Sequence, residues 1–142
     1  MELKNIFVAY DGSDNAKKAL EMAKTITLLN ANIHVDIVNV VPVPVLSSTE
    51  TEHLSEIIDL MMEDGKATLH EAQDVMESVS DQISTFLLKG ITPALEMLKM
   101  IDSKNYDLVI IGSRGLSGIR EYMGSVSYRM LHESKASVLV VK

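Results

Sequence analysis

Short apolar runs alternate with longer stretches of helical periodicity along the whole chain. Five runs rich in β-branched residues lie at or within residues 5–10, 32–41, 81–89, 107–111 and 137–141. They show little polar alternation, which is typical of parallel strands that are covered on both faces. The pattern therefore predicts five strands separated by helices.

The first two intervals between these runs carry amphipathic helical patterns. Either Ser13 or Asp14 can cap the first helix, because both side chains accept from free backbone N–H groups. The apolar face of this helix is predicted to be Ala16, Ala19, Leu20, Ala23 and Ile26. A longer apolar stripe runs from Leu54 to Val79, and Gly65 is a position at which that helix can kink or split.

Two further helices complete the alternation. Gly90 ends the third run, and Thr92 is predicted to cap a helix with Pro93 at its first position. The buried face of that helix is predicted to be Ala94, Leu95, Leu98 and Ile101. Residues 125–133 are predicted to form the last helix. The chain is predicted to be one α/β domain, residues 1–142, with an open, doubly wound parallel sheet of order 3-2-1-4-5.

A glycine-rich turn between the fourth strand and the last helix is the main candidate for ligand binding. Gly112 and Gly115 follow the strand, and Gly124 and Ser125 begin the helix. Without Cβ atoms, such a turn lets backbone N–H groups approach an anion, and the helix N-terminus adds partial positive charge. The simplest interpretation is a phosphate-binding loop. The alternative is a tight turn in which glycine serves only the shape of the backbone.

All three arginines of the chain lie within or just beyond this turn. Arg114, Arg120 and Arg129 carry the planar guanidinium group that suits phosphate. Arg114 stands between the first two glycines and is the arginine expected at the site. Arg120 and Arg129 are equally compatible with solvated surface positions.

The predicted topology brings a second loop to the same place. Ligands of open parallel sheets bind beyond the carboxyl ends of the strands where the winding reverses, which is between the first and fourth strands of this order. Residues 11–13 and 112–115 are therefore expected to face each other. Taken alone, Asp11 is typical of a turn or an N-cap. Opposite the glycine turn, its carboxylate can instead accept hydrogen bonds from a ribose.

Composition narrows the classes of function. The 142 residues are 46% hydrophobic and 23% charged, as expected of a globular chain, and the net charge of −7 disfavours nucleic acid as the main partner. No apolar run approaches the roughly 20 residues that span a bilayer, so no membrane partner is expected. Without cysteine, neither disulfides nor thiolate metal sites can form, and a cytoplasmic location is expected.

Five segments of the sequence resemble the universal stress protein family, in the order in which that family carries them. They are residues 6–13, 38–42, 90–93, 112–127 and 138–141. The resemblance runs from end to end. It implies a nucleotide-responsive stress factor, commonly a dimer, that binds ATP or AMP, with or without Mg²⁺, and is no fast enzyme.

The resemblance also implies positions for each part of a nucleotide. Phosphates would lie at the family's Gly-x2-Gly-x9-Gly-Ser/Thr motif, which is matched by Gly112, Gly115, Gly124 and Ser125 and followed by Val126 and Ser127. The aspartate after the first strand, here Asp11, would contact the ribose. The adenine edge would meet the backbone near Val40, and Ala9 would flank the base.

One departure from the family motif leaves two outcomes open. Eight residues, 116–123, separate Gly115 from Gly124 where the ATP-binding pattern has nine. Either a tighter loop absorbs the deletion, or Gly124 and Ser125 move out of reach of the phosphates. Members of the family that bind no ATP exist. The alternative function is thus a nucleotide-free dimeric interaction protein in which the loop is only structural.

Catalytic signatures are absent from the sequence. There is no P-loop, no HExxH and no Gly-x-Ser-x-Gly motif, and the four histidines show no metal-ligand spacing. ATP hydrolysis is expected to be very slow at most. An enzyme of the related adenine-nucleotide α-hydrolase type is disfavoured by the small size of the chain. The apolar strand at residues 137–141 lies at a sheet edge without proline or charge, which predicts a homodimer through that strand.

Overall fold

The computed structural model describes residues 2–45, 53–115 and 123–142. Its elements, in chain order, are β1 (Asn5–Ala9), α1 (Asp14–Leu28), β2 (His34–Pro42), α2 (Leu54–Val75), the 3-10 helix η2 (Glu77–Gln82), β3 (Ile83–Gly90), α3 (Pro93–Lys104), β4 (Leu108–Gly112), α4 (Ser125–Glu133) and β5 (Ser137–Val141). The strands form one parallel sheet of order β3-β2-β1-β4-β5, which confirms the predicted fold class.

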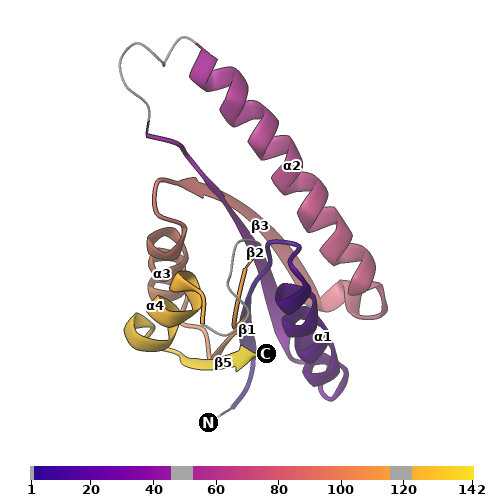
Figure 1. Cartoon of the computed structure of the whole chain (residues 1–142). Coiled ribbons are helices and arrows are strands. Elements are labelled where there is room, and N and C mark those ends of the chain that lie inside the picture. The colour runs from indigo at the N-terminus through magenta and orange to yellow at the C-terminus, as the bar shows by residue number, and fades with distance from the viewer. Residues whose placement is uncertain (1, 46–52, 116–122) are drawn as a thin grey trace.

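Helices cover both faces of this sheet (Figure 1). Alternate residues of β1 divide between two cores. Ile6 and Val8 pack with residues of α1 and α2, while Phe7 and Ala9 pack with residues of α3 and α4. This division explains why the strand sequences are apolar on both faces.

The start of α1 agrees with the sequence prediction, whereas the start of α3 differs from it. Ser13 is the N-cap of α1, and its hydroxyl accepts from the backbone N–H of Ala16 at 3.2 Å. Thr92 occupies the N-cap position of α3, but its side chain makes no capping hydrogen bond. Leu95, predicted to be buried, is 42% exposed, and Met97 takes its place in the core. Proline at the first position favours the start of this helix, because its missing N–H needs no partner there.

Gly65 neither kinks nor splits α2, which continues through it to Val75 before η2 begins. The glycine is buried where the helix crosses the sheet. A Cβ there would stand 2.6 Å from Leu87 Cδ1 and 3.0 Å from Val41 Cγ2. Gly65 therefore permits a close approach of α2 to β2 and β3.

Candidate functional site

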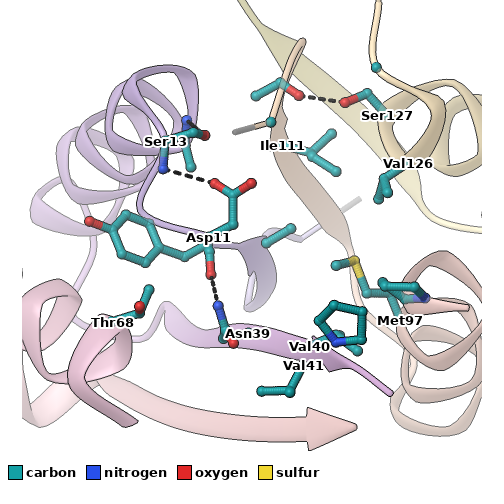
Figure 2. Close-up of a pocket in the computed structure, with 18 of the residues that line it drawn as sticks. Asp11, Ser13, Asn39, Val40, Val41, Thr68, Met97, Ile111, Val126 and Ser127 are labelled. Atoms are coloured by element: carbon teal, nitrogen blue, oxygen red, sulfur yellow. Dashed lines mark hydrogen bonds between the residues drawn. The ribbon is translucent and has the colours of Figure 1, made fainter. Parts of the chain in front are cut away.

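A cavity of about 580 Å³ opens beyond the carboxyl ends of β1, β2 and β4 (Figure 2). Its volume falls in the range of small-molecule sites. All of the residues predicted from the sequence as site residues line it: Ala9, Asp11, Val40, Gly112, Arg114, Gly115, Gly124, Ser125, Val126 and Ser127. The reversal of the winding between β1 and β4 brings these distant segments together.

The loop after β1 holds Asp11 in a defined orientation. Gly12 adopts a positive φ of 81°, which glycine accommodates without strain. The backbone N–H of Ser13 then donates to Asp11 Oδ1 at 2.9 Å. The other carboxylate oxygen of Asp11 lies beside Gly115, because a Cβ on that glycine would be 2.9 Å from Oδ2. The two predicted loops therefore face each other.

Asn39 on β2 holds the beginning of the Asp11 loop, and it was not among the site residues predicted from the sequence. Its side-chain amide donates to the carbonyl oxygen of Tyr10 at 2.8 Å, and the residue is buried. A lone amide within the apolar run of residues 37–41 was the signal that could have found it. Beside it, burial and a hydrogen bond to Glu71 raise the pKa of Tyr10 well above its usual value, so its hydroxyl stays neutral.

Gly112 and Ser127 fix the base of the glycine turn. A Cβ on Gly112 would lie 2.7 Å from the backbone carbonyl carbon of Asn15, so packing of β4 against α1 by itself requires a glycine here. The Ser127 hydroxyl donates to the carbonyl oxygen of Gly112 at 2.5 Å, and Asn15 Nδ2 donates to Ser113 Oγ at 2.8 Å. These contacts tie β4 to the helices on either side of the sheet.

Gly124 lies against the beginning of the glycine turn. Its backbone N–H donates to the carbonyl oxygen of Ser113 at 2.7 Å, and a Cβ on Gly124 would lie 3.6 Å from Arg114 Cα, an ordinary contact. Gly124 is the N-cap of α4, and among the described residues no side chain caps the first N–H groups of the helix. This first turn, at Ser125 and Val126, lines the cavity. Residues 116–122, including Arg120, lie outside the described residues.

Three charged side chains line the described part of the cavity: Asp11, Asp64 and Arg114. Arg129 is not among them, because it pairs with Glu133 at 2.6 Å on the exposed side of α4. The surface interpretation of Arg129 is therefore correct. Hydrogen bonding and charge from Glu133 raise the pKa of its guanidinium, which stays a cation at any physiological pH.

Helix α2 supplies a wall of the cavity that the sequence did not indicate. Met61, Asp64, Gly65 and Thr68 all line it. Within the described ranges, no group of three or more His, Cys, Asp or Glu side chains is arranged to hold a metal ion. Nor is any helix in those ranges long and apolar enough to cross a membrane.

Solved structures share this fold. A universal stress protein UspA from Lactobacillus plantarum superimposes with a TM-score of 0.89 at 20% identity, covering 100% of this chain and 99% of that one. A universal stress protein in complex with cAMP gives a TM-score of 0.72 at 24% identity, over 98% of this chain and 97% of the other. A third, from Archaeoglobus fulgidus in complex with dAMP, gives 0.67 at 22%, over 99% and 98%.

Proteins of similar sequence belong to the same family as these structures. Universal stress protein YxiE of Bacillus subtilis is 33% identical over 96% of this chain and 97% of its own length. Universal stress protein MJ0531 of Methanocaldococcus jannaschii is 32% identical over 98% of this chain and 82% of its own. The model of the universal stress protein family matches residues 2–142. The chain belongs to the universal stress protein family.

Proposed function

We propose that this protein binds an adenine nucleotide, ATP or AMP, in the cavity between the Asp11 loop and the glycine turn. The observation that carries the proposal is the position of Asp11 Oδ2 opposite Gly115, beside the uncapped first turn of α4. A carboxylate there accepts from hydroxyl groups, while free backbone N–H groups and an arginine attract phosphate. Complexes of two related structures with cAMP and dAMP support the choice of an adenine nucleotide.

Each end of the cavity suits a different part of that ligand. The first turn of α4 and Arg114 would hold the phosphates, and Asp11 would hold the ribose. The base would then lie over the ends of β1 and β2, near Ala9 and Val40. The glycine at position 115 lets the Asp11 carboxylate stand beside this turn, because a side chain there would meet Oδ2.

We further propose a regulatory protein with very slow turnover at most. The Ser13 hydroxyl, a nucleophile in the cavity lining, caps α1. No histidine lines the described part of the cavity, so no general base of that kind is available to activate water. An ATPase assay with Mg²⁺ tests this proposal, and a rate near 10 per second, which is typical of enzymes, would overturn it.

The alternative function, a nucleotide-free interaction protein, has specific support. Packing against Asn15 explains Gly112 without a ligand, and the hydrogen bond to Gly112 explains Ser127. The contact of Gly115 with Asp11 likewise accounts for that glycine without a ligand. What favours nucleotide binding as the preferred proposal is that Asp11, Arg114 and the first turn of α4 line one cavity.

Thermal unfolding in the presence of nucleotides distinguishes the two functions. A ligand that binds only the native state stabilises it by about 2.7 kcal/mol at a hundredfold excess over Kd. AMP or ATP, with and without Mg²⁺, should therefore raise the Tm. No shift at millimolar concentration of either nucleotide, together with no nucleotide released from purified protein in mass spectrometry, would favour the nucleotide-free function.

A further inference from the structure

One face of α2 lies directly against the cavity. Met61, Asp64, Gly65 and Thr68 occupy positions i, i+3, i+4 and i+7, which fall on one side of a helix. Gly65 permits this placement, because it brings the helix against Asn39 and Val41 at the end of β2. The side chains next to Gly65 on the same face are consequently held at the edge of the ligand site.

The wall formed by α2 lies on the side of the cavity away from the glycine turn, where the phosphates would bind. Thr68 Cγ2 is 3.7 Å from the position of a Cβ on Gly12, and Gly65 contacts the end of β2. The glycine turn follows β4, and β4 and β2 lie on opposite sides of β1 in the sheet. A nucleotide with its phosphates on α4 therefore presents its base, rather than its phosphates, to α2.

Asp64 is the hydrogen-bonding group that this wall offers to a base. Its carboxylate has no hydrogen bond or ion pair with any other described residue. The hydroxyl of Thr68 is already engaged, because it donates to the backbone carbonyl oxygen of Asp64 at 3.0 Å. An ionised carboxylate only accepts hydrogen bonds. It therefore favours a base edge that carries an amino group and disfavours one that carries a carbonyl oxygen.

We propose that Asp64 is a specificity-determining residue, which accepts a hydrogen bond from the exocyclic amino group of the base and so selects adenine over hypoxanthine. The inference rests on the proposed nucleotide site. The backbone near Val40 would meet the adenine edge, and the Asp64 carboxylate would accept a hydrogen bond from the amino group at that edge.

Affinities for AMP and IMP, measured by calorimetry, test this assignment. The two ligands share their ribose and phosphate and differ at position 6 of the purine. Wild-type protein should prefer AMP by on the order of tenfold or more, because a hydrogen bond to a charged group is lost and a carbonyl oxygen faces the carboxylate instead. In Asp64→Asn, the side-chain amide can donate to that oxygen, so the preference should fall severalfold or reverse.

Two controls separate a hydrogen bond between Asp64 and the base from a general effect of charge. Asp59→Asn removes the same charge from α2 at an exposed position outside the cavity lining and should keep the wild-type preference. Purine riboside 5′-monophosphate lacks the amino group, so wild-type protein should bind it more weakly than AMP. The Asp64→Ala variant should bind both ligands with about the same affinity.

The outcomes also separate this inference from the proposed function. AMP binding with an AMP-to-IMP ratio that is unchanged by Asp64→Asn would overturn the assignment of Asp64 and leave the nucleotide site intact. Absence of AMP binding to wild-type protein would overturn both.

Discussion

The carboxylate of Asp11 and the backbone of Gly115 stand face to face across the cavity. A Cβ on Gly115 would lie 2.9 Å from Asp11 Oδ2, closer than carbon and oxygen tolerate. Asp11 cannot turn away freely, because its Oδ1 accepts from the Ser13 N–H. The winding of the sheet brings these two loops together, and the Asp11 carboxylate fits beside position 115 only when that residue is glycine.

A methyl group at position 115 should impair the site while the fold survives. Gly115→Ala should displace the Asp11 carboxylate and weaken AMP binding by about 1–2 kcal/mol, the scale of a perturbed charged hydrogen bond. Calorimetry measures the affinity of the variant and of wild type, and thermal unfolding without ligand checks that the fold survives. Equal affinities would contradict the geometry.

Removal of the Asp11 carboxylate should weaken nucleotide binding directly. Asp11→Ala should lose roughly 1–3 kcal/mol of binding free energy, because charge-assisted hydrogen bonds to the ribose disappear. Comparison with 2′,3′-dideoxyadenosine monophosphate provides the control. Wild type should bind this analogue weakly, and Asp11→Ala should not distinguish it from AMP.

In Gly65→Ala, the cost of overpacking should exceed the gain in helix propensity. Gly65→Ala would gain up to about 1 kcal/mol in propensity, yet its Cβ meets Leu87, Val41 and Asn39 at 2.6, 3.0 and 3.2 Å. We expect net destabilisation of about 1–3 kcal/mol in urea unfolding, as for other overpacked cores. Ala67→Gly, at an exposed position of the same helix, measures the propensity term alone. A more stable Gly65→Ala protein would contradict this account.

Asp107 should make stability depend on pH in the acid range. Its Oδ2 accepts from the backbone N–H groups of Asn5 and Lys4 at 2.8 and 3.0 Å, and these bonds lower the pKa of the carboxyl. A lowered folded-state pKa contributes stability above the unfolded pKa and loses it as the pH falls. Asp107→Asn should be less stable than wild type at pH 7, and the gap should narrow at low pH. Asp102→Asn, which removes a carboxylate from the surface of α3, is the matched control.

A homodimer through β5 remains a prediction. The strand occupies one edge of the sheet, and its residues Val138–Val141 are half-buried and apolar. Light scattering should give twice the 15.7 kDa of one chain, and Val140→Lys should shift the mass toward the monomer. Thr85→Lys on β3, the strand at the opposite edge, is the control. A monomeric wild type at high concentration would exclude the dimer.

Predictions from local sequence agree with the structure only in part. Ser13 caps its helix as predicted, whereas the Thr92 side chain makes no capping hydrogen bond. By contrast, Gly65 looked like a helix breaker because its effect depends on Leu87 and Val41, which lie in other elements. The sequence of α2 alone carries no sign of the strands beneath it.

The sequence by itself determined the alternation of strands and helices, the class of sheet and the segments that meet in the cavity. It could do so because apolar periodicity, turn residues and the winding rule of parallel sheets act through local chain geometry. Only the tertiary structure decided that Gly112 serves packing, that Asn39 supports the Asp11 loop and that Asp64 reaches the cavity. These properties depend on distances between side chains far apart in sequence, and those distances exist only once the helices have packed on the sheet.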